Sequence, residues 1–119
     1  MAKIRIFKSD DFMRPADGEP IRSVITESEH ATVVAWYVKP GQRIAAHVHP
    51  DGQDTWTVLS GQGEYQLEAG GKSQTIGAGD VVLAHAGSVH GVYNAGAEPL
   101  RFISVVCPLE AGYRLVPTR

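Results

Sequence analysis

Residues 40–65 read "PGQRIAAHVHPDGQDTWTVLSGQGEY", and this stretch decides the fold. His47 and His49 are separated by one residue, and Asp54 follows five positions after the second histidine. Because alternate side chains of a β-strand share a face, the two imidazoles are expected to point the same way. Antiparallel pairing with the next predicted strand would place Asp54 beside them. Two imidazoles and a carboxylate on a rigid sheet are a ligand set for Zn, Mn, Fe, Ni or Co.

The segments around this stretch have the pattern of short β-strands. Thirteen glycines and seven prolines interrupt runs rich in Val, Ile, Thr and aromatic residues. No window between Gly41 and Pro108 keeps the apolar periodicity of an amphipathic helix. Strands at regular spacing, separated by turns such as "SGQG" and "GAGD", are typical of an all-β sandwich or barrel. The predicted strands are Arg22–Thr26, Thr32–Lys39, Ile44–His49, Thr55–Leu59, Glu64–Glu68, Ser73–Ile76, Val81–Ala84, Val89–Tyr93 and Arg101–Cys107.

The two ends of the chain lie outside this series of strands. The N-terminal residues Lys3–Phe7 predict an additional edge strand, followed by the loop "RPADGEP". The tail "EAGYRLVPTR" is expected either to pack on the barrel or to extend to a partner subunit. No repeat or linker divides the sequence, so residues 1–119 are expected to form a single domain.

Composition excludes several classes of partner. The net charge is −2, with 11 basic and 13 acidic residues mixed along the chain, so nucleic acid is not an expected partner. Cys107 is the only cysteine and cannot form an internal disulfide, which fits a reducing compartment. The first residues lack the apolar run of a signal peptide, and the longest apolar stretches are too short for a bilayer span. We therefore expect a cytoplasmic protein without a membrane partner.

A second cluster of interest reads "GAGDVVLAHAGSVHGVYN", residues 77–94. His90 lies in a predicted strand after a glycine turn, and it could supply a third imidazole. Local patterning does not show that His90 reaches the first cluster, because that step depends on the fold.

Taken together, the two clusters resemble the motifs of the cupin family. The first cupin motif is a glycine, five residues, His-x-His, three or four residues, a glutamate, six residues and a glycine. In residues 41–61 this chain has a glycine at each end, His47, His49 and, after four intervening residues, Asp54. The second motif corresponds to residues 79–94, with His90 at the histidine position and His85 at a position usually held by proline.

The resemblance covers about residues 40–107 and implies a jelly-roll β-barrel, also called a double-stranded β-helix. In that fold the two motifs form paired strands around one metal. The ligands would then be His47, His49, Asp54 and His90, holding one divalent transition metal per chain (Fe, Mn, Ni, Co or Zn). The family also forms dimers through exchange of strands or tails, so a homodimer is expected, with the N-terminal segment and Tyr113–Val116 as contact elements.

Two departures from the family pattern leave alternatives open. Asp54 is one methylene shorter than the usual glutamate. Either the metal lies nearer this strand, or Asp54 reaches it through water, or Asp54 is a catalytic base beside a three-histidine site. His85 is either a solvated turn residue or a catalytic acid–base group at the mouth of the barrel, because histidine titrates near neutral pH.

Two further residues are predicted to line the substrate pocket. Trp56 lies two positions after Asp54 and should share its face, although aromatic residues in a small barrel usually belong to the core. Arg43 has the parity of His47 and His49, so it could hold a substrate carboxylate, with a solvated arginine as the alternative.

These residues predict a metal-dependent cupin that binds and transforms a small organic molecule by oxygenase- or isomerase-type chemistry. One alternative is a non-catalytic small-molecule binding or stress protein. Another is a metal-free isomerase or epimerase in which a histidine moves the proton. The sequence names no substrate, because one fold hosts many reactions.

Overall fold

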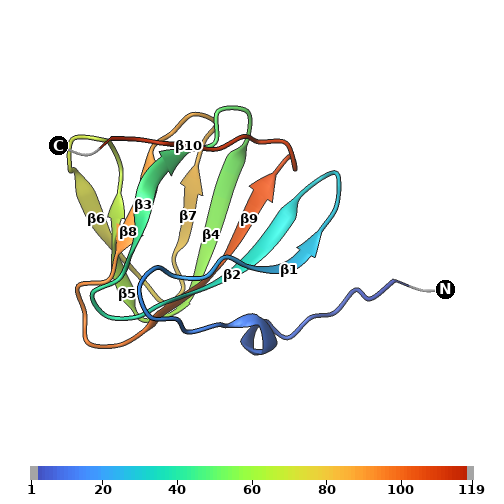
Figure 1. Ribbon diagram of the computed structural model, residues 1–119, viewed down its shortest axis with the longest axis horizontal. Helices are drawn as coiled ribbons and strands as arrows, with labels where there is room; N and C mark the ends of the chain where they lie inside the picture. Colours follow the sequence, from blue (N-terminus) through green and yellow to red (C-terminus); the bar gives the residue numbers. More distant parts are fainter. Residues whose placement is uncertain (1–2, 118–119) are drawn as a thin grey trace.

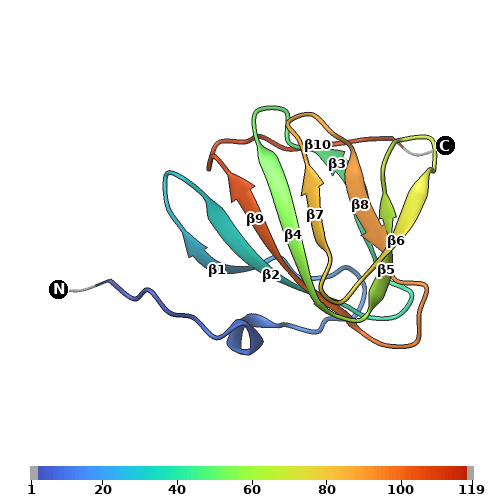
Figure 2. The same ribbon diagram turned by 180° about the vertical axis from the view of Figure 1, so that it is seen from behind.

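The computed structural model describes residues 3–117 as two antiparallel β-sheets that face each other (Figures 1 and 2). One sheet has the strand order β1-β2-β9-β4-β7, and the other has the order β10-β3-β8-β5-β6. The elements are η1 (Ser9–Phe12), β1 (Ser23–Glu27), β2 (Thr32–Val38), β3 (Arg43–Val48), β4 (Gln53–Ser60), β5 (Gln62–Gln66), β6 (Ser73–Gly77), β7 (Val81–Ala84), β8 (His90–Tyr93), β9 (Leu100–Cys107) and β10 (Arg114–Leu115). Among the described residues, no helix has the length and hydropathy that a membrane span requires.

The packed core fills one end of the space between the sheets. Alternating residues of β2, β4 and β9 point inward, because each strand buries only one face. Toward one end these residues are Val38, Val58 and Phe102, all almost fully buried. Toward the other end the same faces line a cavity. Trp56 separates the two regions, and its ring stacks on Phe102 with the centroids 4.1 Å apart.

The predicted strand over Lys3–Phe7 is wrong. This segment is extended but pairs with no strand of its own chain, and it leads away from the barrel (Figure 1). Ile4 and Ile6 are exposed, so the apolar side chains of this alternating pattern do not pack against the barrel. The anchor of the segment lies further along, where Asp10 pairs with Arg101.

The C-terminal tail packs on the barrel of its own chain. β10 pairs antiparallel with β3, placing Leu115 opposite His47, and the Val116 amide donates to the Ala46 carbonyl. This is one of the two arrangements expected from the sequence.

A β-bulge in β3 changes which residues face the cavity. In the pairing with β8, Ile44 lies opposite Val92 and His47 lies opposite His90. Two residues of β3 therefore oppose Gly91 alone, which is the count that defines a bulge. The bulge reverses the alternation between Ile44 and His47, so that both residues line the cavity.

The prediction that Arg43 points to the same face of the strand as His47 and His49 is therefore wrong. Arg43 is exposed and does not line the cavity. Its guanidinium instead lies over the Tyr93 ring, 4.7 Å from the centroid, where a cation–π contact is favourable.

Candidate metal centre

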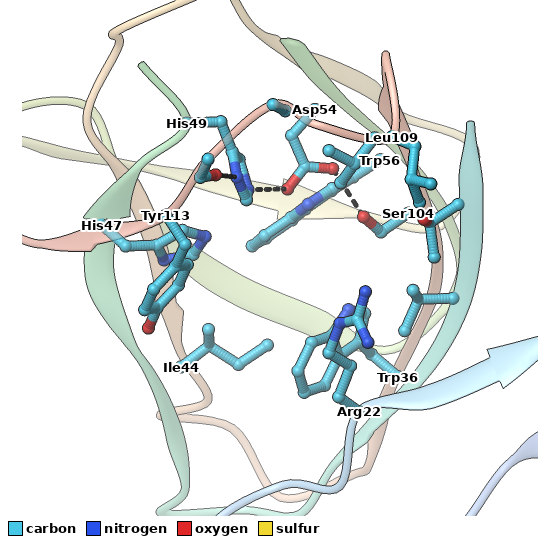
Figure 3. A pocket seen from close by; sticks show the side chains of 15 residues that line it. Arg22, Trp36, Ile44, His47, His49, Asp54, Trp56, Ser104, Leu109 and Tyr113 are labelled. Atoms are coloured by element: carbon cyan, nitrogen blue, oxygen red, sulfur yellow. Dashed lines mark hydrogen bonds and ion pairs between the residues drawn. The ribbon is translucent and has the colours of Figure 1, made fainter. Parts of the chain in front are cut away.

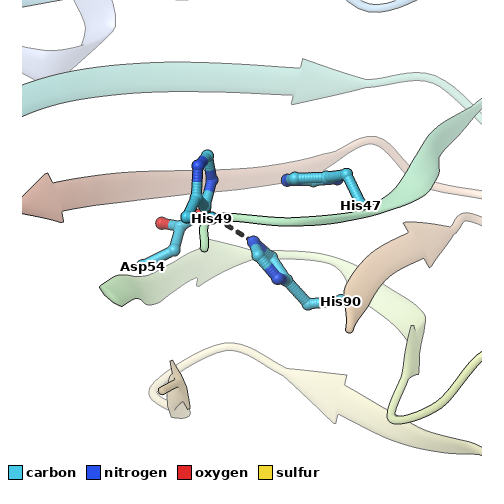
Figure 4. A group of neighbouring side chains, drawn as sticks. All are labelled: His47, His49, Asp54 and His90. Atoms are coloured by element: carbon cyan, nitrogen blue, oxygen red, sulfur yellow. Dashed lines mark hydrogen bonds and ion pairs between the residues drawn. The ribbon is translucent and has the colours of Figure 1, made fainter. Parts of the chain in front are cut away.

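Four side chains from three strands meet at one end of the barrel (Figure 4). His47 lies on β3, His49 follows its end, Asp54 lies near the start of β4, and His90 is the first residue of β8. Their ligand atoms all lie within 4.8 Å of one another. The register decides this meeting, because His90 is directly opposite His47 in the β3–β8 pair. The third imidazole thus reaches the first cluster.

The Nδ1 atom of each imidazole lies close to a backbone carbonyl oxygen. Since a carbonyl only accepts hydrogen bonds, each Nδ1 carries a proton and donates it. In the neutral ring, Nε2 then holds the free lone pair, which is the state that binds a metal. The pairs are His47 with Ala45 at 2.7 Å, His49 with Gly112 at 2.7 Å, and His90 with Ser88 at 3.1 Å.

The free Nε2 atoms of His49 and His90 face the Asp54 carboxylate. Asp54 Oδ2 lies 2.9 Å from His90 Nε2 and 3.5 Å from His49 Nε2. When Nδ1 holds the proton of each neutral ring, these contacts bring lone pairs together without a donor between them. A cation or an additional proton must compensate, so the donor set fits a divalent transition metal held by nitrogen and oxygen ligands.

Ser104 orients the Asp54 carboxylate. Its Oγ donates to Asp54 Oδ1 at 2.5 Å, and both residues are buried. The other carboxylate oxygen, Oδ2, points toward His49 and His90. Sequence reasoning did not identify Ser104, although it has the inward parity of Phe102 on β9. Its partner is far away in the sequence, and a serine within an apolar strand gave no local signal.

The environment sets the protonation states that a metal site requires. Burial opposes ionisation of Asp54, but hydrogen bonds from His49 and His90 in their protonated forms, and from Ser104, outweigh it and hold the pKa of Asp54 well below its usual range. The hydrogen bond to Asp54 raises the pKa of His49 more than burial lowers it. Burial, followed by the charge of His90, lowers the pKa of His47 to about 4. At neutral pH, Asp54 is therefore ionised and His47 is neutral, as ligands must be.

The group opens into a cavity of about 530 Å³, a size typical of small-molecule sites (Figure 3). Trp56 lines its wall beside Asp54, and most of the remaining lining is apolar. Three lining residues that the sequence reasoning did not assign to the pocket are Arg22, Leu109 and Tyr113. They lie outside the two motifs, in the segments that enter β1 and lead to β10.

His85 does not join the cluster. It follows β7 in the turn before β8, its side chain is exposed, and it is not among the residues that line the cavity. Its backbone carbonyl accepts a hydrogen bond from the Ser88 amide. His85 therefore has the position of a solvated turn residue.

A small antiparallel jelly-roll barrel with three imidazoles and a carboxylate at one end belongs to a recognisable class of β-proteins. Comparison with family models identifies the class, because residues 34–106 match the model described as Cupin domain. This match spans more than half of the chain, and the chain belongs to the cupin family.

Solved structures give the same fold. An uncharacterized conserved protein with a double-stranded β-helix domain from Klebsiella pneumoniae is 50% identical, with a TM-score of 0.93, covering 98% of this chain and 100% of that one. A Thermus thermophilus protein is 24% identical, with a TM-score of 0.81 and coverages of 88% and 98%. The polyketide cyclase RemF from Streptomyces resistomycificus is 17% identical, with a TM-score of 0.80 and coverages of 98% and 88%. The last two show the fold alone. A comparison with curated proteins gave no match.

Proposed function

We propose that this chain is a metal-dependent cupin that binds and transforms a small organic molecule in the barrel cavity. The observation that carries the proposal is the convergence of the three imidazoles on Asp54, with each Nδ1 already donating to a carbonyl oxygen. His47, His49, Asp54 and His90 would hold one divalent transition metal. Such a metal supplies a Lewis acid that polarises a carbonyl or enol oxygen or, if it is iron, chemistry with O₂.

The chain's own residues position the ligand and control protons. The carbonyl oxygens fix the imidazole rings, and Ser104 fixes the carboxylate, so the group is organised before a ligand arrives. Asp54 Oδ2 is the carboxylate oxygen directed toward the histidines, available to the metal or to a substrate proton. The mostly apolar walls, including Trp56, lower the local dielectric constant and so strengthen electrostatic interactions inside the cavity. These features support isomerase- or oxygenase-type chemistry on a small carbonyl or enol compound.

A metal-free isomerase is the second candidate, and the 2.9 Å contact between Asp54 and His90 favours it. When His90 carries a second proton on Nε2, the Asp54 carboxylate at that distance accepts a hydrogen bond from it, and the protonated His90 and Asp54 form an acid–base pair. In this case the cluster would function with a shared proton in place of a metal.

Metal analysis separates these two functions. Wild-type protein and the variants His47→Ala and His90→Ala are purified without chelators, and bound metals are quantified by mass spectrometry. We expect about one transition metal per chain in the wild type and a large loss in both variants. The matched control is His30→Ala, because His30 is exposed and is not a member of the group. Equal, near-zero metal in all four proteins, even after incubation with Zn²⁺, Mn²⁺ or Fe²⁺, would refute the metal-dependent function.

A further inference from the structure

Arg22 brings a positive charge to the cavity lining. It directly precedes β1 and lies on the opposite side of the cavity from His49 and Asp54, with its guanidinium projecting into the cavity (Figure 3). Within residues 3–117, Arg22 makes no ion pair and no side-chain hydrogen bond.

With His47, His49 and Asp54 engaged by a metal, the remaining polar groups of the lining are mainly hydrogen-bond donors. The walls beside Arg22 are apolar, formed by residues such as Val34, Trp36 and Ile44. Trp56 lines the same cavity, and its buried Nε1 is a donor without a hydrogen-bond partner in the described part of the chain. The Ser104 hydroxyl already donates to Asp54. A ligand that complements this lining must bring acceptor atoms together with apolar surface.

A carboxylate meets this requirement better than a phosphate. The planar guanidinium offers paired N–H donors that match the two oxygens of a carboxylate. Arg22 is the only lysine or arginine among the lining residues, which matches the single charge of a carboxylate. A phosphate carries close to two charges and usually meets more than one cation. The apolar walls favour a carboxylate attached to an apolar or aromatic body.

We propose that Arg22 is the residue that selects the ligand of this cavity, and that the ligand is a small carboxylate with an apolar body. The proposal deepens the proposed function and rests on it, since it places the carboxylate at Arg22 and the rest of the ligand toward the metal group. Arg22 thereby takes the role that the sequence pattern suggested for Arg43.

Tryptophan fluorescence provides a direct test. The chain has two tryptophans, Trp36 and Trp56, and both line the cavity, so their emission reports on its occupancy. Benzoate and its neutral analogue benzamide are titrated into metal-free and Zn²⁺-treated protein. The variants are Arg22→Gln and the matched control Arg43→Gln, whose guanidinium lies outside the cavity over Tyr93. Zinc content is measured on the same samples.

We expect wild type and Arg43→Gln to bind benzoate about tenfold more tightly than benzamide, since a charge-assisted hydrogen bond contributes that much. Arg22→Gln should lose this preference, binding both probes equally, while its zinc content is unchanged. The proposal is overturned if Arg22→Gln keeps the wild-type affinity for benzoate. It is also overturned if wild-type protein shows no preference, or if neither probe changes the emission.

The zinc measurement keeps this proposal distinct from the proposed function. If zinc binds at one per chain and Arg22→Gln has no effect, then only the role of Arg22 fails. If no zinc binds but the Arg22-dependent preference for benzoate is present in metal-free protein, the anion site stands and the metal-dependent function fails.

Discussion

At the scale of single residues, the candidate metal centre depends on contacts made behind its ligands. The imidazoles of His47, His49 and His90 are each held by a backbone carbonyl, and Asp54 is held by a buried serine. Backbone carbonyls remain in place when side chains are substituted. The serine hydroxyl is therefore the support that mutation can remove most cleanly.

Ser104→Ala should weaken zinc binding by roughly 10- to 100-fold, because partners behind metal ligands typically contribute that much. The hydroxyl that orients Asp54 Oδ1 is lost, and the buried carboxylate keeps one fewer donor. Isothermal titration with Zn²⁺ measures the change. Ser88→Ala is the control, because Ser88 supports His90 through its backbone carbonyl, which alanine retains. Similar affinities for the two variants would contradict this role of Ser104.

His47 should make the stability of the metal-free protein depend on pH. Its pKa is lowered from 6.5 to about 4 in the folded state, so between these values the unfolded chain binds the proton and the folded chain does not. Stability should therefore fall as pH drops from about 6.5 to about 4, by roughly 3 kcal/mol in total. Urea unfolding of wild type and His47→Gln across this range measures the effect.

Two neighbours of His47 in the metal group, His49 and Asp54, also have shifted pKa values, but they change stability with the opposite sign or in another pH range. The raised pKa of His49 gives stability that is present below pH 6.5 and is lost as pH rises through the folded value. The lowered pKa of Asp54 gives stability that is lost only as pH falls below about 3.8. Both groups remain in His47→Gln, so the difference between the two proteins isolates His47. Parallel pH curves for the two proteins would show that His47 is not the source.

At the scale of elements, the site could be predicted only where the alternation of side chains along a single strand decides which residues share a face. His47, His49 and Asp54 were predicted to meet from strand periodicity and an antiparallel pairing of their two strands. The residues do meet, but the pairing is wrong, because β3 and β4 lie in different sheets and Asp54 reaches the histidines across the space between the sheets. His90 could be assigned only through the family motif, since the β3–β8 pairing joins segments about forty residues apart. Arg43 was misassigned because a bulge shifts the alternation by one residue, and nothing in "RIAAH" indicates where a bulge occurs.

Gly91 tests whether the bulge positions the ligands. A Cβ at this position would lie 2.7 Å from the Ile44 carbonyl oxygen and 3.1 Å from Ala46 Cα, both backbone atoms that cannot rotate away. Gly91→Ala should therefore destabilise the protein by about 1–3 kcal/mol and weaken zinc binding, because His90 is its neighbour. Thermal unfolding and zinc titration provide the measurements.

Gly70→Ala is the matched control for this substitution. Gly70 is exposed in the β5–β6 connection, where a Cβ would be 3.9 Å from its nearest neighbour and no shift is required. If Gly91→Ala is as stable as Gly70→Ala and binds zinc as the wild type does, the bulge does not hold the ligands in place.

At the scale of the whole molecule, the barrel could be predicted from its motifs, whereas the N-terminal segment could not. All nine strands expected between residues 22 and 107 are present, with their ends shifted by a few residues. The alternating pattern of Lys3–Phe7 resembles a strand, but strand formation also requires a free sheet edge within reach. Figures 1 and 2 both show the segment leaving the barrel, so its pattern has no partner within the chain.

A second copy of the chain would supply that partner. We expect a homodimer in solution, because Ile4 and Ile6 expose apolar side chains from an extended segment that can add to a sheet edge. The double substitution Ile4→Asp/Ile6→Asp should convert the dimer to monomer, as measured by light scattering. Leu67→Asp, at an exposed apolar residue distant in sequence from the segment, should leave the mass unchanged. A monomeric wild type, or a dimeric double variant, would contradict this expectation.

The contact between the C-terminal tail and the metal group has a thermodynamic consequence. The Gly112 carbonyl holds the His49 ring, and the Val116 amide bonds to β3 three residues before that ring. Docking of the tail and occupancy of the centre are therefore linked, and linkage is reciprocal. An ion that draws His49 into place must slow hydrogen exchange at the Val116 amide. A fusion partner joined to the C-terminus that pulls the tail free must lower affinity for the ion by the same factor. Hydrogen exchange in the C-terminal tail would thus indicate whether an ion occupies the metal group.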